Sequence, residues 1–84
     1  MTMTLADQKR GAVVDVVGVD GDVDSIVLRL FEMGLVPGTT ITVLRRAPLG
    51  DPLQILVRGT RLCLRVKDAM RFRVSAATTT TTTA

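Results

Sequence analysis

The chain has 84 residues, enough for one small domain, and 46% of them are hydrophobic, which favours a packed globule over a disordered chain. Aromatic residues make up only 2% and histidine is absent, which removes the stacking platforms of single-strand nucleic-acid binders and the commonest catalytic base. The net charge of +3 is modest for a protein that binds nucleic acid.

The first half of the chain predicts an apolar anchor at Leu5, a strand and one helix. The segment AVVDVVGV is typical of a strand whose inner face carries Val14 and Val16. We expect a helix over about 24–33, in which Asp22 or Asp24 accepts hydrogen bonds from the free N–H groups of the first turn.

The segment EMGLVPGT predicts an abrupt change from helix to strand. Gly34 stands where a left-handed residue follows a helix, a conformation that glycine adopts without penalty. Pro37 prevents the helix from continuing, and Pro37 followed by Gly38 fits a type II turn.

The second half of the chain predicts further short strands and one helical turn. TTITVLRR and LQILVRG both alternate between apolar and polar residues, and APLGDP between them predicts a rigid hairpin loop built on Pro48, Gly50 and Pro52. RLCLRV and RFRV are further strands, separated by a helical turn at KDAM. The expected inward residues are Ile41, Val43, Leu53, Ile55, Val57, Leu62, Leu64, Phe72 and Val74.

These elements predict a mainly β protein, a small closed barrel of about five strands with one inserted α-helix and one late helical turn, because closure removes exposed strand edges. We expect the folded domain to span 4–74. The threonine-rich segment 75–84 is low-complexity sequence that we expect to be disordered.

The lone cysteine, Cys63, cannot form a disulfide within the chain, which favours a reducing compartment. The N-terminal segment lacks the apolar core of a signal peptide, and no apolar run approaches the roughly 20 residues of a membrane-spanning helix. We therefore expect a cytoplasmic protein.

The sequence favours neither catalysis nor a cofactor. Cys63 points outward between Leu62 and Leu64 and has no activating partner nearby, so we interpret it as a small residue on a strand. The candidates for a metal site are Asp20, Asp22 and Asp24. Their pattern lacks both the glycine and the closing glutamate of a calcium loop, so we expect a solvated loop and a helix cap instead.

Arginines on neighbouring strands raise a nucleic-acid hypothesis, since small barrels do bind oligonucleotides. The residues concerned are Arg45, Arg46, Arg58, Arg61 and Arg65. Because Arg45 and Arg46 are adjacent on one strand, their side chains point to opposite faces and at most one joins a given patch. We expect no nucleic-acid binding.

The helix carries more apolar surface than a helix on a small barrel needs. Ile26, Leu30 and Met33 form one stripe, which we expect to be the core face. The full apolar arc covers roughly 220° and leaves a flank at Leu28 and Phe31.

Either loop residues cover this flank or it is an interface. We expect the turns to hold the flank and the APLGDP loop as one rigid surface that binds another macromolecule. The predicted partner-binding residues are Leu28, Phe31, Leu35, Leu49 and Leu56.

The chain resembles the FeoA family of bacterial ferrous iron uptake. The matching stretches are RLFEMGLVPGT at 29–39, RRAPLGDPLQILVRG at 45–59 and LCLR at 62–65, and Leu28 and Phe31 depart from the usual pattern. The resemblance implies an SH3-like barrel with an inserted helix. It also implies a non-catalytic accessory role through binding to the cytosolic GTP-binding domain of a FeoB-type transporter, with membrane association only through that partner.

Self-association is a second expectation, because the apolar flank suits it. Three other functions stay open: a detached SH3-like domain of a metal-dependent repressor, a small nucleic-acid-binding barrel, and an iron carrier that uses the aspartates at 20–24.

Overall fold

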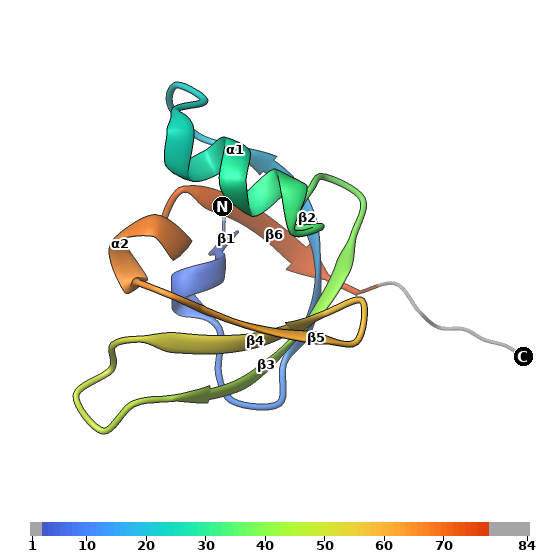
Figure 1. Cartoon of the computed structure of the whole chain (residues 1–84). Coiled ribbons are helices and arrows are strands. Elements are labelled where there is room, and N and C mark those ends of the chain that lie inside the picture. The colour runs from blue at the N-terminus through green and yellow to red at the C-terminus, as the bar shows by residue number, and fades with distance from the viewer. Residues whose placement is uncertain (1–2, 78–84) are drawn as a thin grey trace, which may run out of the picture.

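One antiparallel sheet of six strands forms the body of the molecule (Figure 1). The structure is a computed structural model and describes residues 3–77. The strands lie in the order β1-β6-β2-β3-β4-β5. The elements in chain order are β1 (Met3–Thr4), the 3₁₀ turn η1 (Leu5–Asp7), β2 (Val13–Val19), α1 (Ser25–Glu32), β3 (Thr40–Arg46), β4 (Leu53–Val57), β5 (Thr60–Leu64), α2 (Val66–Ala69) and β6 (Phe72–Ala76).

The predicted mainly β fold is confirmed. The inserted helix, α1, lies between β2 and β3, and the late helical turn, α2, lies just before the last strand. The sixth strand is β1, in which Met3 and Thr4 pair with β6. The predicted closure is wrong for the residues that the structure describes, because β1 and β5 form two separate edges of the sheet. Register shifts in β2 and β3 bend the sheet, so that it wraps around its core without a closing ladder.

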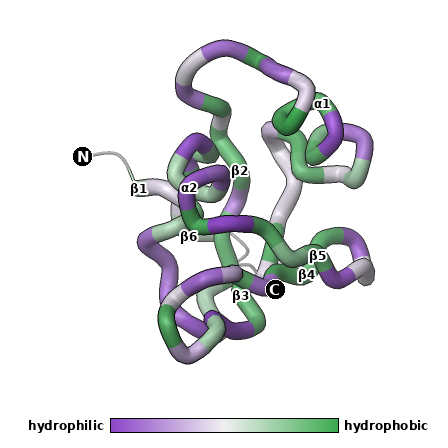
Figure 2. Tube along the Cα trace, turned by 60° about the vertical axis from the view of Figure 1, so that its left-hand side comes forward, coloured by the Kyte–Doolittle hydropathy of each residue, from purple (hydrophilic) through white to green (hydrophobic). Residues whose placement is uncertain are grey.

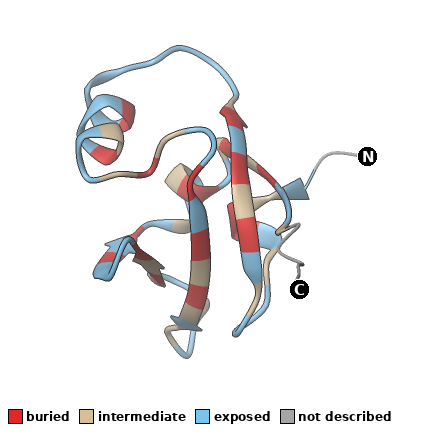
Figure 3. Ribbon diagram, turned by 90° about the vertical axis from the view of Figure 1, so that its right-hand side faces the viewer, coloured by how far each residue is buried: buried red, intermediate tan, exposed pale blue. Residues whose placement is uncertain are grey.

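The core is aliphatic apart from Phe72 and lies on the inner face of this bent sheet. Buried and less buried residues alternate along the strands, as Figure 3 shows. The inward positions predicted for the strands are confirmed, including Val14 and Val16 on β2. The largest fully buried side chains are Phe72, Leu5, Leu35, Ile41, Leu53 and Ile55.

Capping interactions define both ends of α1. Asp24 Oδ1 accepts a hydrogen bond of 3.0 Å from Val27 N, which satisfies one free N–H of the first turn. At the other end, Gly34 N donates to Phe31 O and Leu35 N donates to Leu30 O. This is a Schellman motif, and the φ of +100° at Gly34 explains why glycine stands there. Leu35 is thereby directed into the core.

A type II turn follows and joins α1 to β3. Thr39 N donates to Val36 O at 3.1 Å, and Gly38 has a φ of +94°. Two further backbone bonds attach the turn to β2: Gly38 N donates to Val16 O, and Val16 N donates to Thr39 O. These backbone hydrogen bonds fix the exit from α1 to the sheet.

The loop between β3 and β4 is held by its own backbone and by α2. Gly50 N donates to Ala47 O at 2.7 Å, and Ala47 N donates to Pro52 O at 3.1 Å. Asp51 Oδ1 accepts a hydrogen bond of 3.1 Å from Val66 N at the start of α2. Asp51 thus connects the loop to an element that lies fifteen residues further along the chain.

The C-terminal boundary lies further along the chain than the sequence predicted. Ser75 and Ala76 continue β6, and Ala77 N donates to Val13 O, so the predicted domain end at Val74 was wrong. Pairing with β2 extends the strand into the small residues that precede the threonines. The remainder of the predicted tail, 78–84, lies outside the described residues. No helix within 3–77 is long and apolar enough to cross a membrane.

Candidate functional site

The face that α1 buries differs from the predicted one. Val27 and Leu30 are buried, and Phe31 packs against the core. Ile26 and Met33, expected in the core, are 45% and 48% exposed. At about 100° per residue, the buried face is rotated by roughly 90° from the predicted stripe. Because the apolar arc of α1 is so wide, periodicity alone could not select its centre.

Two residues predicted to bind a partner belong to the interior instead. Leu35 is 0% exposed, so its prediction as a partner-binding residue was wrong. The Schellman motif turns its side chain inward. Phe31 is half-buried, and its ring meets that of Phe72 edge to face with centroids 6.4 Å apart. The part of the flank that Phe31 supplied is thus covered by the chain itself.

The remaining predicted residues do not form one surface. Leu28 is 52% exposed on α1, Leu49 is 96% exposed in the β3–β4 loop, and Leu56 is half-buried on β4. Figures 1 and 2 place α1 at the upper end of the molecule and the β3–β4 loop at the lower end. The predicted single surface of helix flank and loop is therefore wrong, because the strands β3 and β4 separate its two parts.

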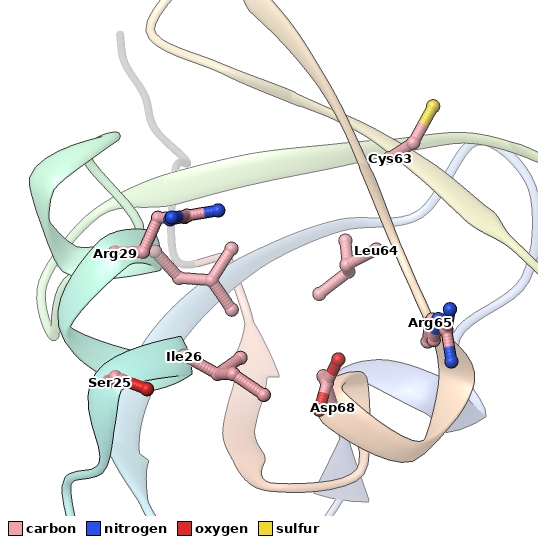
Figure 4. A pocket seen from close by; sticks show the side chains of 8 residues that line it. Ser25, Ile26, Arg29, Cys63, Leu64, Arg65 and Asp68 are labelled. Atoms are coloured by element: carbon pink, nitrogen blue, oxygen red, sulfur yellow. The ribbon is translucent and has the colours of Figure 1, made fainter.

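A groove between α1, β5 and α2 is a concave site that sequence reasoning missed. Its volume is about 340 Å³, and we call it the α1–α2 groove. The lining residues are Ser25, Ile26, Arg29 and Leu30 of α1, Cys63 and Leu64 of β5, and Arg65 and Asp68 at α2. In Figure 4 the side chains of Ile26 and Leu64 point toward each other across the groove, with Asp68 below Leu64. The sequence signal was the surplus apolar arc of α1.

The groove has an apolar floor and charged rims. Leu30 and Leu64 are buried and form the floor. Arg29 on one wall and Arg65 on the other are both exposed, and Asp68 is half-buried. Two arginines and one aspartate leave one net positive charge on these rims.

Three other arginines of the described chain, Arg46, Arg71 and Arg73, are held by internal partners. Arg71 Nη1 lies 2.8 Å from Asp24 Oδ2, and Arg73 Nε lies 2.8 Å from Asp20 Oδ1 as an ion pair rather than an aligned hydrogen bond. Arg46 donates to the carbonyl oxygens of Ala6 and Gln8. Within residues 3–77, Arg29 and Arg65 have no such hydrogen bond or ion pair, as is also true of the exposed Arg10, Arg45, Arg58 and Arg61.

The acidic loop is occupied by these ion pairs. Arg71 also donates to the carbonyl oxygen of Asp22. Arg73 passes over Gly18, where a Cβ atom would collide with the guanidinium group. No group of three or more potential metal ligands occurs in the part of the chain that the structure describes. Asp20 and Asp24 therefore fasten the loop to β6 and the segment before it through their carboxylates, and Asp22 does so through its backbone carbonyl.

The electrostatics of Asp24 follow from its position at the helix N-terminus. The hydrogen bond from Val27 N and the interaction with Arg71 lower the pKa of the Asp24 carboxyl below its ordinary value of 3.8. The carboxylate is thus stabilised in the charged form that caps α1.

The predicted basic face is divided between several environments. Arg45, Arg58, Arg61 and Arg65 are exposed, whereas Arg46 is committed to the N-terminal turn. Cys63 is an exposed free thiol on β5, and in Figure 4 it points away from the groove. The exposed arginines do not supply the aromatic surface on which bases stack in single-strand nucleic-acid binders. The exposed thiol does not by itself supply an activated nucleophile for catalysis.

Comparison with known families decides the identity of this fold. A family model described as the FeoA domain matches residues 3–76. The chain belongs to the FeoA family. This family functions in ferrous iron transport, so the predicted resemblance is confirmed.

Solved FeoA structures have the same fold. The solution structure of the FeoA protein from Chlorobium tepidum has a TM-score of 0.82 and 35% identity, covering 88% of this FeoA-family chain and 70% of that chain. The crystal structure of Stenotrophomonas maltophilia FeoA complexed with zinc, described as an SH3 domain protein, has a TM-score of 0.76 and 33% identity over 87% of this chain and 89% of that one. The predicted SH3-like class is therefore confirmed.

A relative in Porphyromonas gingivalis carries the family within a much longer chain. It is described as a fusion of Fe(2+) transport protein A with the Fe(2+) transporter FeoB. The two proteins are 44% identical over 46 residues, which is 55% of this chain and 6% of the fusion protein.

Proposed function

We propose that this FeoA-family chain is a non-catalytic accessory protein of ferrous iron uptake that binds the cytosolic domain of a FeoB-type transporter. The observation that carries the proposal is the fusion of related sequence to FeoB in one polypeptide. Covalent linkage holds two modules at a high effective concentration, which is of use when the modules act on each other.

The outer side of α1 is the surface that best suits such docking. Ile26 and Met33 are exposed on one flank of the helix and Leu28 on the other, with Arg29 and Glu32 between them. Exposed apolar side chains that gather around one element mark an interaction surface more often than scattered ones. The β3–β4 loop presents only Leu49 at the other end of the molecule.

The test is direct binding between the purified chain and the cytosolic domain of the FeoB-type transporter from the same organism, measured by surface plasmon resonance. We expect wild type to bind and Leu28→Asp to lose at least about tenfold in affinity, because a charge would replace a desolvated aliphatic side chain. Val17→Asp is the matched control, since Val17 is equally exposed but lies on β2.

Thermal unfolding of the three proteins shows whether they are folded alike. Absence of binding by folded wild type would contradict the proposed function. Equal loss of binding in Leu28→Asp and Val17→Asp would contradict the assignment of the docking surface to α1.

A further inference from the structure

We propose that the α1–α2 groove binds a peptide segment of a partner protein in which a large aliphatic side chain stands beside carboxylates. The inference rests on the proposed function and deepens it by naming the chemistry of the segment that docks. It follows from the shape of the groove, its apolar floor and its unpaired arginines.

The shape and floor of the groove select an aliphatic side chain. Leu30 and Leu64 close the bottom, and Ile26 forms a wall that is still 45% exposed. The volume of about 340 Å³ lies at the small end of ligand pockets, which run from roughly 300 to 1,000 Å³. It has room for a side chain or two from a passing peptide, which would remove the exposed surface of Ile26 from water.

The rims of the groove select negative charge next to that side chain. Arg29 extends from α1 toward β5 in Figure 4, and Arg65 stands on the opposite side at the start of α2. A guanidinium group presents a planar fork of N–H donors that matches a carboxylate. Since neither arginine has an internal acceptor within residues 3–77, both are free to bind an external one.

Asp68 narrows the class of anion. Its carboxylate lines the same groove and would repel a phosphate group, which carries a charge of about −1.5 to −2 near neutral pH. A carboxylate carries a single negative charge, so a carboxylate beside Arg29 or Arg65 meets less of this repulsion. The net charge of the whole chain, +3, further favours an acidic segment.

Short synthetic peptides test this assignment, with the full chain as the binding protein. The first peptide carries one leucine between glutamates, the second replaces the leucine with serine, and the third replaces the glutamates with lysines. Fluorescence anisotropy measures affinity, and ¹⁵N NMR shift changes locate the site. We expect the first peptide to bind and to shift the signals of Arg29, Leu64 and Arg65.

The serine peptide should bind at least about tenfold more weakly, because burial of a leucine side chain is lost. The lysine peptide should not bind measurably, because like charges then face each other across the rims.

Two charge-reversal variants give a matched comparison on the protein side. Arg65→Glu should weaken the first peptide about tenfold at low salt, because one attraction becomes a repulsion. Arg45→Glu, an exposed arginine on β3 away from the groove, makes the same change in net charge and should alter affinity less than about twofold. Equal effects of the two variants, or equal binding of the leucine and serine peptides, would overturn the inference.

The same variants separate this inference from the proposed function. If the transporter domain binds wild type and Arg65→Glu equally, the groove assignment fails and the accessory role stands. If the transporter domain does not bind but the leucine peptide does, the proposed function fails and the groove assignment stands. Sedimentation tests whether the groove binds a second copy of the chain instead. If wild type self-associates and Ile26→Ser abolishes that association, the proposal of a partner peptide is overturned.

Discussion

The carboxylate of Asp24 makes two different interactions, one through each oxygen. Its Oδ1 caps α1 by accepting a hydrogen bond from Val27 N. Its Oδ2 accepts a hydrogen bond from Nη1 of Arg71, in the segment before β6. The first interaction is local and could be read from the sequence as a capping pattern. The second joins residues that are 47 positions apart, and only the folded chain brings them together. A single carboxylate therefore orients both the start of the helix and the loop before it.

The lowered pKa of Asp24 gives a pH dependence of stability with a defined sign. A folded-state pKa below the unfolded value means that Asp24 contributes stability above the ordinary value of 3.8, and that this contribution is lost as the pH falls through the folded-state pKa. We expect Asp24→Ala to be less stable than wild type at neutral pH, and the difference to shrink below about pH 3.8.

Urea unfolding at a series of pH values measures this difference. Asp22→Ala is the control, because only the backbone carbonyl of Asp22 takes part in the interaction with Arg71. A difference between wild type and Asp24→Ala that is independent of pH would refute the capping and ion-pair explanation.

Helix α1 shows how the ends of an element set the face that it buries. The Asp24 cap, the Schellman motif at Gly34 and the inward turn of Leu35 fix the rotation of the helix. That rotation buries Val27 and Leu30, brings Phe31 onto Phe72 and leaves Ile26 beside the groove. The same residues with a different rotation would present a different surface to a partner.

The environments of Phe31 and Leu28 predict different effects on stability when each is replaced by aspartate. Phe31→Asp should destabilise the fold by about 1–3 kcal/mol, because it places a charge against the core and removes the aromatic pair with Phe72. Leu28→Asp should change stability by less than about 0.5 kcal/mol, since the side chain is exposed. Thermal or urea unfolding distinguishes them, and equal stabilities would show that Phe31 is not part of the packed interior.

At the scale of the whole molecule, polar contacts join segments that lie far apart in the chain. Arg46 at the end of β3 reaches the carbonyl oxygens of Ala6 and Gln8 around η1. Asp51 holds the β3–β4 loop against the start of α2 in the same manner. These contacts connect β3 to the N-terminal turn and the β3–β4 loop to α2.

Adjacent arginines provide a test of this contribution. Arg46→Ala should lower the free energy of unfolding by about 1.5–3 kcal/mol, the usual range for hydrogen bonds that involve a charged group. Arg45→Ala should have an effect within about 0.5 kcal/mol, because its side chain is exposed to solvent. Chemical denaturation measures both variants. If they are equally stable, Arg46 does not hold the N-terminal turn.

Local sequence was sufficient for most of the fold. The alternation of β3 to β5 identified their buried residues, and Gly34, Pro37 and Gly38 located the turn from helix to strand, because such patterns depend on neighbours in the chain. The family resemblance also followed from local motifs, which the match over residues 3–76 confirms. Strand β1 escaped prediction because two residues carry no periodic signal.

Tertiary structure alone decided the rotation of α1, the internal partners of the arginines and aspartates, and the groove. The apolar arc of α1 is wide enough to fit several rotations, so the helix by itself does not specify which side chains stay in water. Ion pairs such as Asp20 with Arg73 join positions that no local pattern links. The surface offered to a partner depends on how separate elements pack, and packing is a property of the complete folded chain.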